Sequence, residues 1–475
     1  MSALPAEALM QWGAFRVDVS ADGRAFALGG SGATWARFEL DGLTPAGRIT
    51  DDPDETEHGF TLGSAVGAVR HGVAENWTLR LALSAQEGAT IDDPPRLRIS
   101  PQPGYVAWVW AAGAEGLIAV APTRRAGPVI GLRLMQGWLG AMSGGLRLGP
   151  PGLGLRPGHR WVGTLRGELY GGINAIEARL PRWLTPLELT AGQPWEFHDP
   201  DQALVVQPPA TTRSEGEVLQ VLAPPGRAGI ALHSPRGLTS LNLSVAPTLD
   251  TLLAAGAARV LAGSEPVSPG GAFVVAEALG RSLISEPSAA EQFLDDAAWH
   301  SDDLLAIAAT VVRGQRTGNA RTIRSALTRL GRVHPQLGYG RVVMTAWLAC
   351  LALGEDASEA GMALLSRPGT TDWVALELQA LGLRSVEVSG GLFAGLINAL
   401  GGDLPGEPVG LTSVLQAQLV GLLQLCPEEW PMAPAAASCA QKSSRRLLAG
   451  LASARFDDPD DLAVLAWLAL GASLV

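Results

Sequence analysis

Apolar and polar residues alternate with a period of two through the first half of the chain. The runs 15–19, 77–83 and 241–245 each place their apolar side chains on one face. Such alternation predicts strands with one buried face. Turn-forming sequences such as Asp22-Gly23 separate the runs. The pattern predicts roughly a dozen or more strands before the period changes.

These strands could be arranged in two ways. A large β-sandwich, or two smaller β units dividing near the proline-rich stretch 181–210, agrees with the number and spacing of the runs. The segment from Val17 to Leu28 resembles the strand, turn and strand of a propeller blade. A propeller repeats its blade about every 40–50 residues, and the sequence shows no second good copy. We therefore predict a sandwich-like half, with a propeller-like half as the alternative.

After Pro247 the apolar residues recur at helical spacing, beginning with Leu249, Leu252 and Leu253 on one face. Further helices are predicted at about 304–312, 320–333, 341–353, 373–382, 391–400, 412–425, 436–454 and 459–470. Short loops between them favour antiparallel neighbours, hence helical hairpins. The predicted organisation is a β-rich domain at 1–247 followed by an all-α helical domain at 248–475.

The order of a β-sandwich followed by helical hairpins resembles that of glycosidases with an (α/α) toroid behind a sandwich. The likeness lies in the architecture and in no motif residue. Residues 248–475 are also few for a full toroid. What the resemblance implies is a carbohydrate-active hydrolase.

The composition excludes several kinds of chemistry. Lys442 is the only lysine, so a Schiff-base enzyme would have to use it, and a phosphate-binding loop of the GxxxxGK[ST] type is absent. Cys350, Cys426 and Cys439 are an odd, widely spaced set, which favours a reducing compartment over a disulfide framework. With no CxxC and no HExxH, the sequence predicts neither a metal nor a cofactor.

Charge and apolar patterning bear on location and partners. The net charge of −11 disfavours general binding to nucleic acid, because phosphate contacts need a positive surface. The N-terminal residues lack the basic and apolar regions of a signal peptide. The longest apolar runs are shorter than the roughly 20 residues that a membrane span needs. We therefore expect a cytoplasmic protein, and its scarcity of lysine and abundance of arginine are typical of a GC-rich bacterial or phage source.

Acidic pairs at 295–296 and 302–303 are seven residues apart, with Trp299 and His300 between them. Paired carboxylates beside an imidazole could act as general acid and base, or could hold a divalent cation. The simpler interpretation is that Ser301 is a helix N-cap and that the second pair are first-turn acids, which the helix dipole favours.

The segment between Asp303 and Glu355 contains seven arginines and no acid. Four of them span about 140° of the helix near 320–333, opposite its apolar side, and form a candidate partner-binding face: Arg321, Arg324, Arg329 and Arg332. The face could bind an acidic partner or a phosphate-bearing ligand. It could equally be a solvated surface that pairs with the chain's own acids at 295–303.

No motif for a nucleophile is present, and the seven histidines are scattered singly. Trp108 and Trp110 lie on one predicted strand face, where they could line a sugar site, although a core role is favoured. The absence of a catalytic motif weighs against an enzyme. The sequence thus predicts a non-enzymatic structural or protein-interaction component of a bacterial or phage assembly, through a protein partner or self-assembly. The alternative is a carbohydrate-active hydrolase that uses acids such as Asp295, Asp302 or Asp303.

Overall fold

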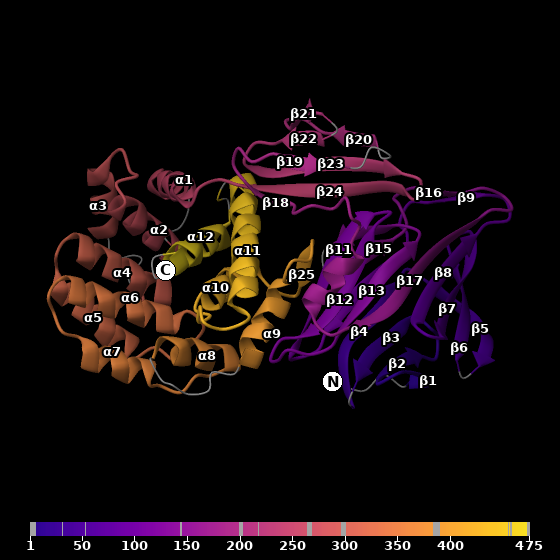
Figure 1. Cartoon of the computed structure of the whole chain (residues 1–475), viewed down its shortest axis with the longest axis horizontal. Coiled ribbons are helices and arrows are strands. Elements are labelled where there is room, and N and C mark those ends of the chain that lie inside the picture. The colour runs from indigo at the N-terminus through magenta and orange to yellow at the C-terminus, as the bar shows by residue number, and fades with distance from the viewer. Residues whose placement is uncertain are drawn as a thin grey trace.

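The structure is a computed structural model that describes residues 6–30, 32–52, 54–142, 145–198, 203–216, 218–263, 268–295, 301–382, 390–454, 456 and 458–472. The N-terminal part is built of strands and the C-terminal part of helices, and the two lie side by side (Figure 1). The last long strand ends at Ala246 and the first α-helix begins at Leu249. The predicted order of β then α is confirmed.

The first layer contains the first four strands of the chain and three later strands. Its order is β1 (Ala6–Trp12), β2 (Phe15–Ser20), β3 (Ala25–Gly30), β4 (Ala33–Asp41), β10 (Arg96–Pro101), β15 (Gly145–Leu148) and β14 (Leu139–Met142). Each strand is antiparallel to its neighbour in this order.

The second layer is also antiparallel throughout. Its order is β5 (Thr44–Asp52), β6 (Glu55–Leu62), β7 (Ala65–Val73), β8 (Trp77–Ser84), β17 (Arg160–Tyr170), β13 (Val129–Gln136), β12 (Gly116–Pro122) and β11 (Tyr105–Gly113). Strand β11 joins the two layers, because its last residues also pair with β14.

The two layers therefore belong to one curled, hydrogen-bonded sheet that encloses a common apolar core. Phe26 and Phe38 stack in this core with ring centroids 4.7 Å apart, and Val17 and Val19 are fully buried. The curled sheet resembles a half-barrel more than a sandwich of two separate sheets. The propeller alternative is wrong, because a propeller needs separate blades.

A further group of strands follows the curled sheet and packs over the helices. It contains β18 (Glu188–Thr190), β20 (Ala203–Val206), β23 (Gly226–Ser234) and β24 (Gly237–Ala246), with β18 parallel to β24. Two small sheets and one short helix complete this part. They are the three-stranded sheet of β19 (Trp195–Phe197), β22 (Val218–Leu222) and β21 (Thr211–Glu215), the pair β9 (Ala89–Ile91) and β16 (Leu153–Leu155), and the 3₁₀ helix η1 (Ile173–Arg179).

The C-terminal part is an array of α-helices. They are α1 (Leu249–Leu261), α2 (Pro269–Gly280), α3 (Pro287–Asp295), α4 (Leu304–Arg316), α5 (Ala320–Leu330), α6 (Tyr339–Ala352), α7 (Ser358–Leu365), α8 (Asp372–Leu381), α9 (Gly390–Leu400), α10 (Ser413–Leu423), α11 (Ala433–Ala454) and α12 (Pro459–Ala472). No described helix is both long enough and apolar enough to cross a membrane.

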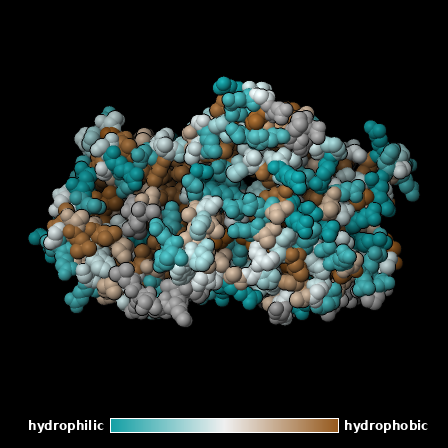
Figure 2. All heavy atoms as spheres, viewed as in Figure 1, coloured by the Kyte–Doolittle hydropathy of each residue, from teal (hydrophilic) through white to brown (hydrophobic). Residues whose placement is uncertain are grey.

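Two features tie the helices to the strands. The short strand β25 (Glu407–Val409) lies within the helical part but pairs with β11, so that part is not purely α. A single buried apolar cluster also runs from β11 through β24 to α12. The space-filling view shows apolar patches on the helical part and mainly polar residues where helices meet strands (Figure 2). Independent folding of 1–247 and 248–475 stays a prediction.

Candidate functional site

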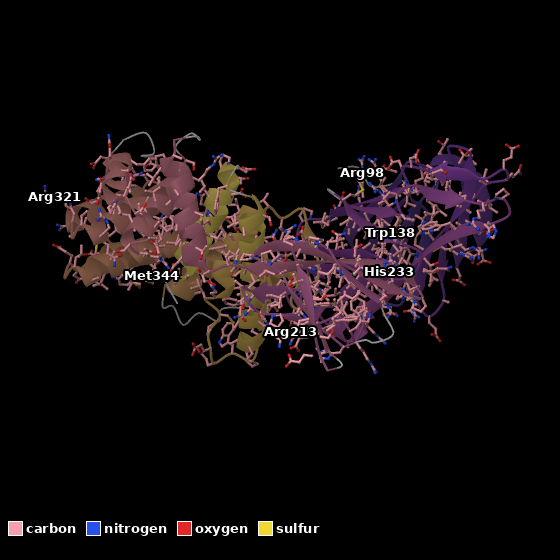
Figure 3. All side chains as sticks on the ribbon, turned by 90° about the horizontal axis from the view of Figure 1, so that it is seen from above. Arg98, Trp138, Arg213, His233, Arg321 and Met344 are labelled. Carbon is pink, nitrogen blue, oxygen red and sulfur yellow. The ribbon has the colours of Figure 1, made fainter. Side chains whose placement is uncertain are left out.

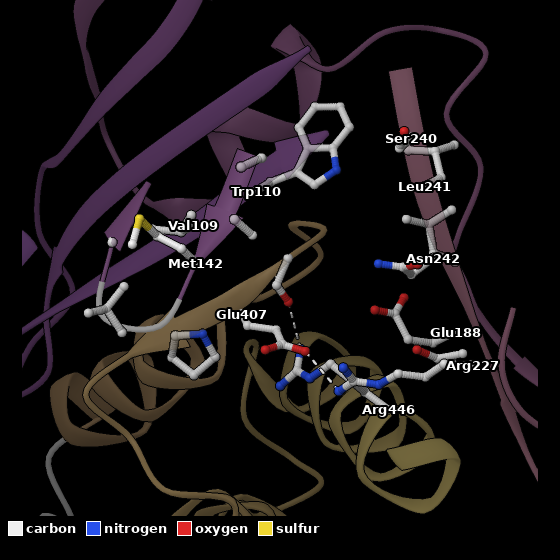
Figure 4. A pocket seen from close by; sticks show the side chains of 18 of the residues that line it. Val109, Trp110, Met142, Glu188, Arg227, Ser240, Leu241, Asn242, Glu407 and Arg446 are labelled. Atoms are coloured by element: carbon white, nitrogen blue, oxygen red, sulfur yellow. Dashed lines mark hydrogen bonds and ion pairs between the residues drawn. The ribbon is translucent and has the colours of Figure 1, made fainter. Parts of the chain in front are cut away.

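A wedge-shaped cavity opens where the helical part meets the strands (Figure 4). Strands β11 and β24 meet at one described residue pair, Gly113 with Thr239, and then diverge. Strand β25 and Arg446 of helix α11 also line the cavity. The cavity between these elements has a volume of about 370 Å³. That volume is within the usual range of ligand pockets.

A second cavity of about 440 Å³ adjoins the first. The two share Leu187 and Glu188 in their walls, so we treat them together as one cleft. The second cavity is enclosed by the loop 180–187 on one side and by helix α11 on the other. The first residues of the proline-rich stretch 181–210, which the sequence suggested as a division between two β units, thus form a wall of this cleft.

Helix α11 presents a row of cations to the cleft. Lys442 and Arg446 are four residues apart and therefore lie on one helical face, and Arg445 follows beside them. Arg446 is buried, donates to Gln416 Oε1 at 3.1 Å and to the Gly406 carbonyl oxygen at 3.4 Å. These contacts fix the guanidinium group in the floor of the first cavity.

Lys442 is partly buried at the second cavity. Its Nζ donates to the carbonyl oxygens of Leu404 and, at 3.5 Å, of Gly402. Burial lowers the pKa of Lys442 below its usual value, although the charge of Glu188 opposes this shift. A neutral amine has two N–H donors and one lone pair. With two carbonyl acceptors engaged, neutral Lys442 would turn its lone pair toward the cleft.

Two carboxylates face the first cavity from opposite walls. Glu188 on β18 is 6% exposed, and its side chain points into the cavity (Figure 4). Glu407 on β25 is exposed and paired with Arg227 at 2.8 Å. Trp110 and Met142 add an apolar wall. The cleft thus combines cations that can bind an acidic group, an amine able to exchange a proton, and an indole surface.

The two tryptophans that the sequence analysis singled out, Trp108 and Trp110, have different positions. Trp108 is buried, with the Arg446 guanidinium 4.9 Å from its ring centroid, and its Nε1 donates to the Pro405 carbonyl oxygen at 2.8 Å. It therefore supports the floor of the cleft. Trp110 is 6% exposed and lines the first cavity.

The arginine face predicted on α5 lies away from the cleft, at the far end of the helical part, as the label of Arg321 shows (Figure 3). Arg324 pairs with Glu355 at 3.4 Å. Arg329 pairs with Asp302, also at 3.4 Å. Arg321 and Arg332 are exposed and form no ion pair with any residue that the structure describes. Part of the face therefore pairs with the chain's own acids.

The acidic pairs near this face do not line the cleft. Asp303, rather than the expected Ser301, is the N-cap of α4, and its Oδ1 accepts from the Leu305 backbone N–H at 2.8 Å. Asp295 forms an ion pair with Arg313. Asp296, Trp299 and His300 lie outside the described residues. Within the described part of the chain, no cluster of three or more histidine, cysteine or acidic side chains could hold a metal ion.

Apart from Trp110, the residues that line the cleft were not selected from the sequence. Lys442 was noted only as the sole lysine, although Arg445 and Arg446 at helical spacing beside it were a usable signal. Glu188 and Glu407 gave none, because each lies in a three-residue strand without a periodic pattern.

Comparison with known proteins gives a fold relative. No family model matches the chain, and no curated protein matches it. A solved structure described as a polysaccharide lyase has 11% sequence identity and a TM-score of 0.61, covering 92% of this chain and 93% of that one. A mutant of a glycoside hydrolase family 81 protein from Clostridium thermocellum has 8% identity, coverages of 98% and 87%, and a TM-score of 0.20, too low to carry an argument.

The expectation of a non-enzymatic structural component is corrected by this comparison. The chain shares the fold of a polysaccharide lyase over nearly all of both chains. The expectation of a structural component rested on the absence of a catalytic motif from the sequence. Such a motif is a local sequence pattern, whereas the cleft is assembled from β18, β25 and α11, which are far apart in the sequence.

Proposed function

We propose that this protein is a carbohydrate-active enzyme that cleaves an acidic polysaccharide by β-elimination in the cleft beside α11. The observation that carries the proposal is the convergence of Lys442, Arg446 and Glu188 on one cleft. The fold shared with a polysaccharide lyase supports it. Five cations, which include Arg182, Arg227 and Arg445, and four acids line the cleft, so it is less negative than the chain, whose net charge is −11.

The elimination has a defined balance of bonds and protons. In a uronic acid linked through its 4-oxygen, a base removes the proton from C5. The electrons of that C–H bond form the C4=C5 double bond as the C4–O bond breaks, and the departing oxygen takes up a proton. Negative charge develops on the carboxylate side of the sugar during the step, so fixed cations there lower the barrier.

We assign these roles by position and charge. Lys442 is the base, because burial lowers its pKa and two carbonyl oxygens hold its N–H groups. Arg446 binds the carboxylate, since a guanidinium group matches a carboxylate with two parallel hydrogen bonds. The small exposed part of Trp110 adds an apolar contact for a sugar in the cavity wall.

Hydrolysis is the second candidate, favoured by one observation. Glu188 and Glu407 line the same cavity, and glycoside hydrolysis uses a pair of carboxyl groups that flank the scissile bond. The two reactions leave different products. Elimination creates a double bond conjugated with a carboxylate, which absorbs ultraviolet light, whereas hydrolysis creates only a new reducing end.

The test incubates the purified chain with polygalacturonate, alginate, hyaluronan and heparin, and follows both ultraviolet absorbance and reducing ends. An Arg446→Met variant purified in parallel controls for contaminating lyases. We expect absorbance and reducing ends to rise together on at least one polymer with the wild type only. Reducing ends without absorbance would replace elimination by hydrolysis. Neither signal on any acidic polymer would overturn the proposed function.

A further inference from the structure

The sheet face that lines the first cavity continues beyond it. Met142 on β14 and Gly145 on β15 are cross-strand partners, and both line the cavity. Two residues further along each strand, Gly140 is opposite Arg147. Residues two positions apart on a strand share a face, as do directly opposite residues. Gly140 and Arg147 therefore extend the cavity wall along the sheet.

Trp138 lies across this extension. A methyl group in place of the Gly140 hydrogen would clash with the six-membered ring of Trp138, so the indole rests directly on the glycine. Trp138 is partly exposed and is not among the side chains that pack against either buried apolar cluster of the described residues. The indole thus lies against Gly140, its Nε1 also lies close to Gly113 of β11, and part of the side chain stays exposed to solvent.

Arg147 supplies a cation beside this indole. In the neighbouring strand β10, Arg96 pairs with Asp93 at 2.6 Å and Arg98 pairs with Asp41. Arg147 forms no ion pair with a described residue, and its buried Nε has no hydrogen-bond partner there. A guanidinium group without a carboxylate partner, one strand away from a partly exposed aromatic ring, is therefore available to an external anion.

We infer that Trp138 and Arg147 form an outer subsite for an acidic sugar residue of a polysaccharide that also occupies the cleft. The inference rests on the proposed function and names a longer substrate for the same site. The apolar face of a pyranose ring packs on the indole, and its carboxylate or sulfate group binds the guanidinium group. Trp138 and Arg98 lie on the strand part of the molecule, remote from Arg321 (Figure 3).

Affinity electrophoresis in native gels that contain polygalacturonate, alginate, hyaluronan or heparin tests this subsite. The variants are Trp138→Ala, Arg147→Gln and Gly140→Ala, whose new methyl group displaces the Trp138 ring. The matched controls are Trp373→Ala on α8 and Arg332→Gln after α5, both on the helical part. Melting temperatures identify any variant that is not folded, and the three variants perturb the subsite independently.

We expect the three subsite variants to bind the polymer retained by the wild type about tenfold more weakly, and the controls to bind it as the wild type does. Retention of the wild type with unchanged retention of the folded variants would overturn the outer subsite and leave the proposed function intact. If the wild type is retained by none of the four polymers, the proposed function fails, and the subsite with it.

Discussion

The guanidinium group of Arg446 lies 4.9 Å from the ring centroid of Trp108. Arg446 belongs to helix α11 and Trp108 to strand β11, so this contact joins the two parts of the molecule at the base of the cleft. Trp108 makes a second contact with the helical part, because its Nε1 donates to the Pro405 carbonyl oxygen at 2.8 Å. The orientation of the cation in the cleft therefore depends on an indole of the curled sheet.

Replacing Arg446 by methionine should affect activity more than stability. The variant keeps a long apolar side chain over Trp108 but loses the charge and the hydrogen bonds to Gln416 and Gly406. We expect polysaccharide cleavage to fall about 100-fold, and the free energy of unfolding to fall by about 1–3 kcal/mol. Urea denaturation and initial rates measure the two effects. Wild-type rates in a folded variant would remove Arg446 from the proposed mechanism.

The ion pair between Arg341 and Glu377 should be a main determinant of helical stability. Both side chains are fully buried, with Nε and Oε1 3.0 Å apart, and Glu377 also accepts from the Gly338 backbone N–H at 2.7 Å. Glu377→Gln leaves a buried cation without its counter-charge, which costs about 3–5 kcal/mol. The control is Glu355→Gln, whose exposed pair with Arg324 contributes about 1 kcal/mol or less. If urea denaturation shows that both variants lose the same free energy of unfolding, the buried pair is not the more important of the two.

Stability should fall in mild acid because of His71. Burial lowers the pKa of His71 from 6.5 to about 4, and nearby His58 adds to the effect, while the Gly23 carbonyl oxygen opposes it. Between these two values the unfolded chain binds a proton that the folded chain does not. Stability is therefore full above about pH 6.5 and declines as the pH falls toward about 4. At pH 5 we expect a loss of about 2 kcal/mol from this group.

Urea denaturation of the wild type and of His71→Gln at about pH 8 and pH 5 isolates this contribution. A lower stability of the variant at both pH values does not affect the comparison, because only the difference between the two pH values is used. A pH dependence equal to that of the wild type would show that other groups cause the acid sensitivity.

Local periodicity was enough to predict the element classes, because burial of one face repeats within a few residues. Val17 and Val19 are fully buried, as their alternation required, and α5 spans most of the predicted helix at 320–333. The pairing of strands was beyond this reasoning. β25 contains Pro408 and only three residues, so nothing local in its sequence indicates that it pairs with β11.

The cleft was missed for a similar reason. Lys442 lies on a helix that the sequence predicted at 436–454, but its role depends on Glu188, which the fold alone brings near. The acids that the sequence analysis singled out have local roles instead. Asp303, for example, caps the N-terminus of α4. The spacing of residues along the chain identifies helix caps and helical faces. Residues of a site that is built from distant segments show no regular spacing, so the sequence alone does not identify them.

The arginine face on α5 stays a predicted partner-binding surface. Arg321 and Arg332 have no ion pair with described residues, so their replacement by glutamine should change the free energy of unfolding by less than about 0.5 kcal/mol. If the face binds an acidic protein or a second copy of the chain, association of the double variant should weaken, most of all at low salt. Sedimentation velocity at low and high salt measures this. Association unchanged at both salt concentrations would identify the face as ordinary solvated surface.

The pH dependence of cleavage should report the protonation of Lys442. A base must be neutral to accept the C5 proton, so the rate should rise with pH through the pKa of Lys442. Because burial lowers that pKa from the usual 10.5, the rise should be centred below this value. Lys442→Gln retains donors for the Leu404 and Gly402 carbonyl oxygens but cannot accept a proton. We expect it to lose about 10²–10⁴ in rate and to lack the rise.

Lys442→Arg separates proton transfer from simple charge. Arginine keeps the positive charge near Glu188, but its guanidinium group stays protonated, so it is not a base at working pH. An electrostatic role for Lys442 would leave this variant active, whereas a role as base requires both variants to be inactive at matched melting temperature. If the folded Lys442→Gln variant keeps the same rise of rate with pH, the base is another group, and Glu188 in the same cleft is then the residue to replace.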